Sequence, residues 1–413
     1  MMTDLFQKAL GISDPWHIKS INFDADNKRL DIHVDFTRGA TFTDSDEEAD
    51  TKKAYKAYDT LQKTWRHLNF FQHECYLHAR VPRIKRDDGR IRMISPPWSG
   101  VVSGFTLLFE ALLVQLCKAM PVHSVSQITG VSDYKIWRLL DVYIGAAKFD
   151  EDLSGVNVLG MDETSVAKGH DYITLFVDLD ERRTLHISEG KAAKTVTDFV
   201  EVLEEKGGTR HQIQKVSCDM SPAFIKGVRE DLPAAEITFD KFHILKVINE
   251  GVDTVRREEA KTNPLLKGTR YIFLKNHEAL TSKQKETREE LSLPKLNLKS
   301  IRAMRIRESF QQIYLADSIE EFQDLLKKWY FWATHSQLPP IIKAAKTIKN
   351  HWEGVVNWKK NQINNGLLEG LNSVLQAAKR KARGYKKDHF KVIAYLLTGK
   401  LDFSKVNEHC LPT

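Results

Sequence analysis

The feature that most constrains the fold of this 413-residue chain is a segment from about residue 156 to 258, in which short apolar runs alternate with amphipathic stretches. Short runs bounded by turn residues are typical of strands, and apolar residues at a spacing of three or four are typical of helices. The expected strands lie near Val156–Met161, Tyr172–Asp178, Leu185–Ser188, Val216–Cys218 and Ile237–Phe239, and the expected helices are Thr195–Glu205, one beginning at Pro222 and one ending near Glu258.

Three strands followed by helix, strand, helix, strand and helix is the element order of a ribonuclease H-like fold. Residues 260–355 have helical periodicity and almost no strand pattern. A helical block of this length inside an α/β region indicates an insertion domain rather than a loop. A last helix is expected from Gly366 to near Gly384. We therefore predict an α+β multidomain protein, with an α/β core interrupted by an all-helical insertion domain.

Two of the expected strands deliver carboxylates where they end. The first delivers Asp162 and Glu163, and Val216–Cys218 delivers Asp219. Hard divalent cations prefer oxygen ligands on rigid backbone. A third carboxylate, Glu369, lies on the last helix. Two aspartates at strand ends and a late glutamate form the ligand set of a two-metal phosphoryl-transfer site, and such ligands favour Mg²⁺ or Mn²⁺.

Each carboxylate has an alternative explanation. Glu163 is adjacent to Asp162, and strand alternation points the two side chains opposite ways, so only one can be a direct ligand if the strand continues. Asp178 also ends a strand. Glu369 could instead be a first-turn acid that interacts with the helix dipole.

Residues 124–144 have the pattern of a helix-turn-helix. Gly130 supplies a left-handed turn between two helices, and Ser132 or Asp133 caps the second. Apolar positions on that second helix predict a buried face, at Ile136, Leu139, Leu140 and Tyr143. The remaining face is available for a DNA major groove and carries Tyr134, Lys135 and Arg138. A plain helical hairpin is the alternative.

The first hundred residues carry strand patterns and basic residues. We expect a short helix at 3–10, two strands through Ile18–Phe23 and Leu30–Phe36, and a hairpin at 76–94 that turns at Asp87-Asp88-Gly89. Basic side chains line this hairpin. Contact with DNA phosphates and ordinary surface charge both explain these basic residues. The basic residues of the hairpin are Arg80, Arg83, Lys85, Arg86, Arg90 and Arg92.

The histidines near this hairpin do not form a zinc pattern. Cys75 and His78 have a CxxH spacing, but no second ligand pair follows at the usual distance. We therefore expect His67, His73 and His78 to be structural or surface residues. The acidic segment 43–53 is expected to be a solvated loop.

Composition limits the class of protein and its partners. The formal net charge of +7 is compatible with a nucleic-acid partner. Four widely spaced cysteines support neither a disulfide framework nor a thiolate zinc site, so a reducing cytoplasm is expected. The N-terminus has no signal-peptide pattern, and Val101–Leu116, interrupted by Glu110, is too short to span a membrane.

Six stretches in order resemble the DDE transposases of bacterial insertion sequences, specifically the ISL-three group. They extend from about residue 64 to residue 400. The matching stretches are TWRHLNFFQHECYLHARVPRI, GMDETSVAKGHDYITLFVDLD, VSCDMSPAFIKGV, ITFDKFHILKVINEGVDTVRR, RYIFLKNHEALT and NNGLLEGLNSVLQAAKRKARGYK.

The resemblance assigns roles to individual residues. Asp162 corresponds to the first catalytic aspartate, Asp219 to the second and Glu369 to the glutamate, with two Mg²⁺ (or Mn²⁺) ions per site. Asp240 and His243 match a supporting DxxH element, in which His243 either packs structurally or tunes the site. The basic residues that follow Glu369 are placed to grip DNA, and they are Lys379, Arg380, Lys381 and Arg383.

The resemblance also implies an activity. Such a protein binds terminal inverted repeats, cuts the transposon ends and joins them to a target, acting on double-stranded DNA as a homodimer near the nucleoid, with no membrane or small-molecule partner. A DNA-binding regulator with an inert catalytic half and a structure-selective nuclease are the alternatives. Trp329 or Trp332 could stack on a base flipped out of the duplex.

The expected domain boundaries follow from these patterns. Relatives commonly hold a zinc ion near positions 43–47 and 86–89, where this chain has TDSDE and RDDG, so packing alone is expected to hold the hairpin. We expect a β-rich DNA-binding region at 1–98, the helix-turn-helix at 99–150, the catalytic core at 151–259, the insertion at 260–360, and the end of the core with the tail at 361–413.

Overall fold

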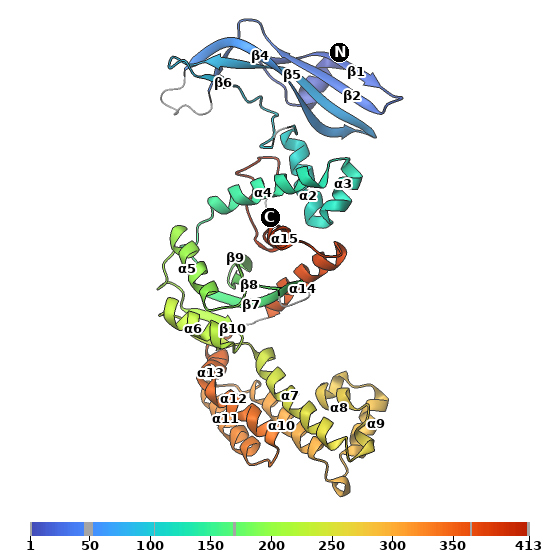
Figure 1. The fold of residues 1–413 in the computed structure, drawn as a ribbon, viewed down its shortest axis with the longest axis vertical. Helices are drawn as coiled ribbons and strands as arrows, with labels where there is room; N and C mark the ends of the chain where they lie inside the picture. The colour runs from blue at the N-terminus through green and yellow to red at the C-terminus, as the bar shows by residue number, and fades with distance from the viewer. Residues whose placement is uncertain (1, 45–52, 103, 168–170, 364–365, 411–413) are drawn as a thin grey trace. The chain divides into compact units, whose positions relative to one another are not determined.

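The computed structural model describes residues 2–44, 53–102, 104–167, 171–363 and 366–410 (Figure 1). Their contacts divide the chain into two compact units. Unit 1 comprises Met1–Glu151 and Leu375–Thr413, and unit 2 comprises Asp152–Val374. The segment 361–413, assigned from the sequence to one domain, is therefore divided between the units at Leu375. Most of the acidic segment expected to be a loop, residues 45–52, lies outside the described residues.

The first part of unit 1 is a six-stranded sheet in the order β1-β2-β5-β4-β3, with β6 paired to β5. The expected β1–β2 and β5–β6 hairpins are confirmed. The long strand β4 was not predicted, because only three of its 17 side chains are buried and it therefore has no apolar face that a sequence pattern would reveal. A short helix, α1 (Met2–Ala9), precedes the sheet. The strands are β1 (Trp16–Asp24), β2 (Arg29–Phe36), β3 (Thr41–Thr43), β4 (Ala54–Phe70), β5 (His73–Lys85) and β6 (Ile91–Met93).

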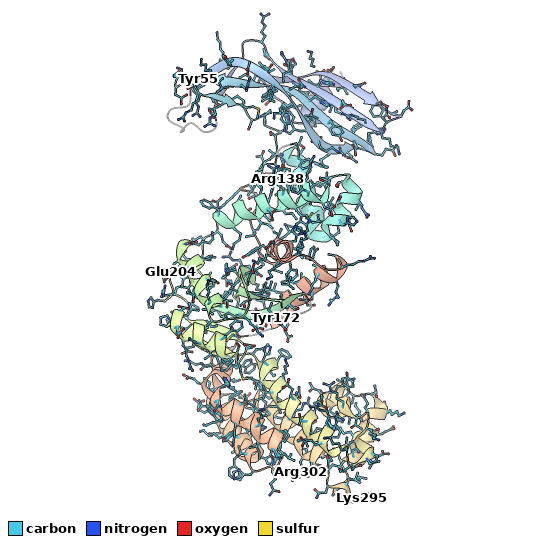
Figure 2. The ribbon with its side chains drawn as sticks, in the orientation of Figure 1. Tyr55, Arg138, Tyr172, Glu204, Lys295 and Arg302 are labelled. Atoms are coloured by element: carbon cyan, nitrogen blue, oxygen red, sulfur yellow. The ribbon has the colours of Figure 1, made fainter. Side chains whose placement is uncertain are left out.

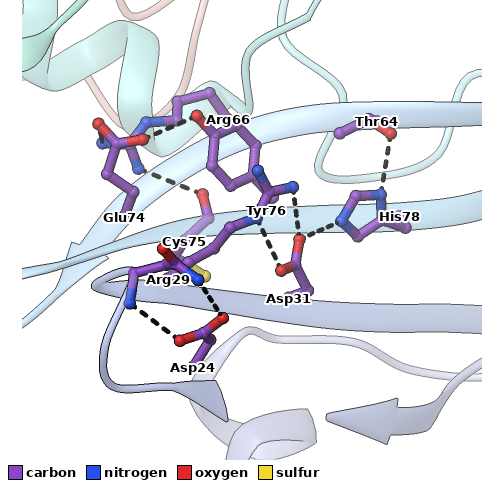
Figure 3. A network of polar contacts seen from close by, with 10 residues as sticks. Asp24, Arg29, Asp31, Thr64, Arg66, Glu74, Cys75, Tyr76 and His78 are labelled. Carbon is purple, nitrogen blue, oxygen red and sulfur yellow. Dashed lines mark hydrogen bonds and ion pairs between the residues drawn. The ribbon is translucent and has the colours of Figure 1, made fainter. Parts of the chain in front are cut away.

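Polar side chains on this sheet are tied to one another, as Figure 3 shows. Asp31 accepts from Arg29 at 2.7 Å and lies 2.6 Å from His78 Nε2, while His78 Nδ1 lies 2.9 Å from the Thr64 hydroxyl. His67 is buried, its Nδ1 is 2.8 Å from the Thr106 hydroxyl, and burial lowers its pKa to about 4. His67 and His78 therefore have structural hydrogen-bonding partners, as expected.

The helical part of unit 1 contains the expected helix-turn-helix. Its helices are α2 (Leu107–Ala119), α3 (Val122–Thr129) and α4 (Asp133–Phe149). Gly130 adopts φ +72° and ends α3, and Ser132 is the cap residue of α4, although its side chain makes no capping hydrogen bond. All four predicted core residues of α4 have no exposed surface, namely Ile136, Leu139, Leu140 and Tyr143.

The C-terminal segment completes the core of this helical part. Helix α15 (Lys387–Thr398) and the residues after it contribute Ile393, Leu396 and Phe403 to the cluster formed by α2, α3 and α4. Asn407 donates hydrogen bonds of 2.8 Å to the Leu107 carbonyl and the Tyr143 hydroxyl. The helix-turn-helix therefore needs residues more than 250 positions away to bury its apolar side chains.

Unit 2 is built on a five-stranded sheet in the order β11-β10-β7-β8-β9. β7, β8 and β9 are successively antiparallel, whereas β10 pairs in parallel with both β7 and β11. Each strand overlaps a predicted one. The strands are β7 (Val158–Ala167), β8 (Asp171–Asp178), β9 (Arg183–Glu189), β10 (Lys215–Cys218) and β11 (Glu236–Phe239).

One prediction about the first strand is wrong: β7 does not end at the carboxylates. It continues through Asp162 and Glu163 to Ala167, because the residues after Asp162 remain paired with β8. Pairing with β10 ends earlier, at Gly160 opposite Ser217. Asp162 therefore lies within a strand, but beyond the end of the parallel neighbour.

The helices of unit 2 share a continuous core with the sheet. Figure 1 shows α10 to α13 gathered beside α7. Trp329 is 2% exposed and donates to the Ile306 carbonyl at 2.9 Å, so it is a core residue and does not stack on a base; Trp332 is 43% exposed. The helices are α5 (Lys194–Glu205), α6 (Pro222–Asp231), α7 (Lys241–Glu259), α8 (Arg270–Leu274), α9 (Ser282–Leu291), α10 (Lys299–Ile313), α11 (Ile319–Thr334), α12 (Pro339–Asn350), α13 (Trp352–Asn361) and α14 (Gly366–Lys381), which extends into unit 1.

Among the described helices, none is both long and apolar enough to cross a bilayer.

Candidate active site and DNA-binding surface

A cavity of about 410 Å³ in unit 2 gathers the carboxylates singled out from the sequence. Asp162, Asp219, Asp240 and Glu369 all line it, together with His243. Asp219 directly follows β10 and Asp240 directly follows β11. Because these two strands are parallel neighbours, their carboxyl ends lie at one edge of the sheet, next to the part of β7 that extends past β10. Sheet topology thus brings together residues 78 positions apart.

Asp162 is oriented by an asparagine that sequence reasoning missed. Asn372 Nδ2 donates to Asp162 Oδ2, and the Asn372 carbonyl oxygen accepts from the Thr164 hydroxyl at 2.8 Å. Asp162 and Thr164 are two residues apart on β7, so their side chains lie on the same face of the strand. Asn372 follows Glu369 by three residues on α14, which places both near one face of the helix. This spacing of three from Glu369 is the feature of the sequence from which Asn372 could have been predicted as a site residue.

Close approach between α14 and β7 depends on Gly160. A Cβ atom at this position would lie 2.7 Å from Leu179 Cδ2 and 3.0 Å from Leu368 Cδ2. Leu368 is buried and immediately precedes Glu369. The missing side chain at Gly160 therefore leaves the space in which Leu368 seats the first turn of α14 against the sheet.

The cavity disfavours the ionised form of the carboxylates that line it. The pKa of Asp162 is raised from 3.8 to about 6, mainly by burial and also by the charges of Asp240 and Asp219, while a hydrogen bond from the Glu163 amide and the charge of His243 act in the opposite direction. Burial and the nearby charge of Asp219 also raise the pKa of Glu163. Carboxylates raise one another's pKa when they compete for one region of low dielectric. A bound cation would relieve this repulsion.

Asp240 organises the other side of the cavity. Its Oδ1 accepts from the Phe242 amide at 3.0 Å, which caps α7, and its Oδ2 lies 3.1 Å from His243 Nδ1. This hydrogen bond raises the pKa of His243, and the charges of Asp219 and Asp162 act in the same direction. The carboxylates around His243 therefore favour its protonated form over its neutral one.

Glu163 and Asp162 both line the cavity, although they are neighbours on a continuing strand. Strand alternation predicts that only one of the two is a direct metal ligand, and this stays a prediction. Pairing of β7 with β10 ends at Gly160, before both residues. Asp178 has a different role, because its Oδ1 accepts from the amides of Asp180 and Glu181 and closes the β8–β9 turn.

The donor chemistry fits a hard divalent cation, since the cavity offers carboxylate oxygens and no thiol that ionises readily. Cys218 lines it, but burial raises the pKa of this thiol well above its usual range. Glu369 is exposed at the cavity rim. In the described parts of the chain, no three His, Cys, Asp or Glu side chains converge closely enough to enclose an ion. The carboxylates share a cavity, but they are not drawn together.

Two further residues at the cavity were not predicted. Phe242 is 52% exposed, and Lys246 is exposed one turn beyond His243. Both also line a second cavity, of about 780 Å³, that continues along α7 and includes Arg257 and Arg270. An exposed ring and an exposed cation beside a carboxylate cavity are suited to a base and a phosphate. Their spacing along α7 was the only signal in the sequence.

The three residues predicted to enter a major groove lie as expected on α4. Tyr134 is 75% exposed, Lys135 and Arg138 are exposed, and neither cation has an ion-pair partner in the described parts of the chain. Arg138 is labelled in Figure 2. The Lys135 ammonium lies 5.8 Å from the centre of the Phe105 ring.

The basic hairpin of the sheet is largely neutralised. Arg80 donates to Asp35 at 2.8 Å, and Arg83 forms a two-point contact with Asp59. Lys85 lies 5.8 Å from the centre of the Tyr58 ring. These partners favour the explanation that Arg80 and Arg83 are ordinary surface charge, and Lys85 retains the stronger case for phosphate contact.

The C-terminal basic residues belong to unit 1. Lys379, Arg380 and Lys381 form the end of α14, which closes with Gly384 N donating to the Lys379 carbonyl at 2.9 Å. Arg383 adopts φ +60° in this turn. These residues therefore lie in the unit that contains the helix-turn-helix, whereas Glu369 lies in the other unit.

Comparison with known proteins identifies the relatives of this chain. The model of the DDE ISL3 family, described as a transposase, matches residues 159–394, and that described as the helix-turn-helix domain of transposase family ISL3 matches residues 95–144. The transposase for insertion sequence element IS1001 of Bordetella parapertussis is 25% identical over 344 residues, covering 81% of this chain and 84% of that protein. The transposase for insertion sequence element IS1557 of Mycobacterium tuberculosis is 24% identical over 369 residues, covering 81% of each.

Proposed function

Because this chain belongs to the ISL3 family of transposases, with the helix-turn-helix domain of that family, we propose that it cuts the ends of its own insertion sequence and joins their 3′-hydroxyls to target DNA. The proposed catalytic core is ribonuclease H-like. The order and directions of the five strands in unit 2 support this, with three antiparallel strands followed by two parallel ones. The helical block at 260–360 is then an insertion into that core.

Asp162, Asp219 and Glu369 are proposed to hold two divalent cations, Mg²⁺ or Mn²⁺, which is consistent with the use of divalent metals by this family. When bound, such ions activate the attacking oxygen and stabilise the leaving oxygen of an in-line displacement at phosphorus. The raised pKa of Asp162 supports the assignment, because the cavity penalises its negative charge until a cation offsets it.

The other residues of the cavity act on the substrate or on these ligands. Asn372 holds Asp162 in one orientation through its hydrogen bond. Asp240 holds His243 at the cavity through a hydrogen bond, and when protonated this ring would add positive charge beside the reacting phosphate. Lys246 is placed to bind a phosphate of the strand being cut, and Phe242 to contact a base beside it.

Recognition of the terminal inverted repeats is assigned to α4, with Tyr134, Lys135 and Arg138 in the major groove. The expected partners are two copies of the terminal repeat and the target duplex. Paired ends call for two protomers, so the active form is proposed to be a homodimer.

The observation that carries this proposal is that Asp162, Asp219 and Glu369 line one cavity within the family's matched region. It is tested by incubating the protein with labelled DNA carrying the element's own ends, with Mg²⁺, with Mn²⁺ and with EDTA. Cleavage at the ends is expected only with metal, and Asp219→Asn should bind the ends without cutting them. Pre-cleaved ends and a plasmid target then separate a transposase, which forms joined product, from a nuclease, which does not.

An inert regulator is the competing function. It has one observation in its favour, since no three described side chains enclose an ion. It predicts that wild-type protein binds the ends with metal present but never cuts them.

A further inference from the structure

A basic segment at the C-terminal end of α14 packs against the second helix of the helix-turn-helix. We define the basic loop as Arg380–Lys386, which comprises the last two residues of α14 and the five residues after it. Within it, Tyr385 lies edge-on to Trp137 of α4, with ring centroids 6.1 Å apart. Just beyond it, His389 stacks on the same Trp137 with centroids 3.8 Å apart and planes 10° from parallel. Burial raises the pKa of Tyr385 to about 12, in keeping with a ring packed into this contact.

Trp137 connects the loop to the groove-facing side of α4. Tyr134, Trp137 and Arg138 are spaced three and four residues apart, so they share one side of the helix. A duplex that contacts Tyr134 and Arg138 therefore lies next to the place where Tyr385 is docked. Both elements belong to unit 1.

The loop carries a concentration of unneutralised charge. Its cations are Arg380, Lys381, Arg383 and Lys386, and all four side chains are exposed. None of them has a carboxylate partner where the structure describes the chain, and the adjacent Asp388 forms no ion pair with them. The arginines of the N-terminal sheet differ in this respect, since Arg80 and Arg83 are held by carboxylates.

We propose that the basic loop binds backbone phosphates of the same DNA duplex that α4 reads, and so extends the footprint of the helix-turn-helix on the terminal repeat. This inference rests on the proposed function and assigns these residues to end recognition rather than to the strand at the carboxylate cavity. Clustered exposed cations beside a recognition helix are suited to phosphates, which position a duplex without reading its sequence.

The test compares full-length wild type with a variant in which Arg380, Lys381, Arg383 and Lys386 are all replaced by alanine. Binding to terminal-repeat DNA is measured by fluorescence anisotropy over a series of salt concentrations. Each lost phosphate contact lowers the salt slope by about 0.9, so a decrease of about 2 to 4 is expected, with affinity at least about tenfold weaker. Hydroxyl-radical footprinting should show lost backbone protection beside the segment contacted by α4.

The control removes the same number of charges elsewhere, by replacing Lys283, Lys295, Lys299 and Arg302 of unit 2 with alanine. Lys295 and Arg302 are labelled in Figure 2. This control should keep the wild-type salt slope. An equal loss in both variants overturns the inference, because net charge alone would then explain it.

Cleavage at saturating DNA distinguishes whether the loop contacts the duplex that α4 reads or the strand at the carboxylate cavity. The loop variant should cut bound ends at a rate within about twofold of wild type. Unchanged affinity with lost cleavage overturns the inference, since the loop would then act at the carboxylate cavity. Wild type and Asp162→Asn are measured in parallel: a wild type that binds ends but does not cut them refutes the proposed function and leaves the binding result for the loop intact.

Discussion

At the scale of single residues, the cavity of unit 2 contains a carboxyl group, that of Asp162, whose ionised form is disfavoured by its surroundings. Asp162 lies beside Asp219 and Asp240, and burial raises its pKa to about 6. Folding therefore binds protons between the unfolded pKa of about 4 and the folded value. The native state is accordingly penalised as pH rises through this window, and this is the opposite of the behaviour of a carboxylate held by an arginine.

Asp162→Asn should remove this penalty. In the metal-free protein at pH 7, the variant is expected to gain up to about 3 kcal/mol in its free energy of unfolding relative to wild type. The gain should vanish below about pH 4, where both pKa values lie above the pH. Urea denaturation of both proteins from pH 4 to 7.5 measures the difference, and a difference that does not change with pH would contradict the assignment.

Divalent cations should also increase the stability of the wild-type protein. A cation that binds only the folded state at a hundred times its Kd stabilises it by about 2.7 kcal/mol. Thermal unfolding with added Mg²⁺ or Mn²⁺ at pH 7 should raise the Tm of wild type and leave that of Asp162→Asn nearly unchanged. Equal shifts for the two proteins would place the ion elsewhere.

Asn372→Ala tests the positioning role of the amide. Loss of a group that orients a metal ligand typically costs about 10- to 100-fold in activity or metal affinity. Cleavage should fall by this factor with DNA binding unchanged. Asn357→Ala is the matched control: Asn357 donates to the Ile237 carbonyl at 2.9 Å and does not line the cavity. An equal loss of cleavage in the control would indicate general destabilisation.

At the scale of elements, the site depends on three strands and two helices that meet at one sheet edge. β10 and β11 end there, β7 continues past them, and α7 begins directly after Asp240. α14 approaches β7 closely because Gly160 has no side chain. Packing of this helix on the sheet therefore positions the first turn of α14, which carries Glu369.

Gly160→Val should displace α14. The added atoms meet Leu179 and Leu368, and overpacking of this kind costs about 1–3 kcal/mol. We expect lower stability and a larger loss of cleavage than of DNA binding. Gly370→Ala is the control on α14, because no atom lies within 4 Å of the added Cβ and alanine favours the helix by about 0.5–1 kcal/mol. Wild-type cleavage by Gly160→Val would show that this close approach is dispensable.

At the scale of the whole molecule, unit 1 is assembled from both ends of the chain. Ile393, Leu396 and Phe403 are buried against the helices that precede residue 151. α14 begins in unit 2 at Gly366, carries Glu369 in its first turn, and ends in unit 1 at Lys381. The helix-turn-helix therefore shares its core with the C-terminal segment.

Residues 1–151 expressed alone should fold incompletely. The N-terminal sheet keeps its own core in this fragment, but the apolar surface of α2 and α4 stays exposed, so the helices should bind a hydrophobic dye and lack a cooperative unfolding transition. Addition of residues 375–413 as a separate peptide should restore the transition and DNA binding. A cooperative transition in the fragment alone, observed by circular dichroism, would show that the C-terminal helices are not required.

The sequence by itself determined the local elements and several of the site's residues. Apolar runs located all five strands of unit 2, and Asp219 and Asp240 follow directly where β10 and β11 end. The turn at Gly130 could also be predicted, because glycine favours a left-handed conformation, and so could the buried face of α4, because periodicity indicates which side of an element is buried.

Only the tertiary structure decided which of these surfaces meet. The hydrogen bond from Asn372 to Asp162 joins residues 210 positions apart, the partners of Arg80 and Arg83 come from other strands, and the C-terminal helix packs on α4. β7 continued past Asp162 because β8 offered it a pairing partner. Periodicity reports how much of each element is buried, whereas the identity of the partner depends on long-range packing that no local pattern encodes.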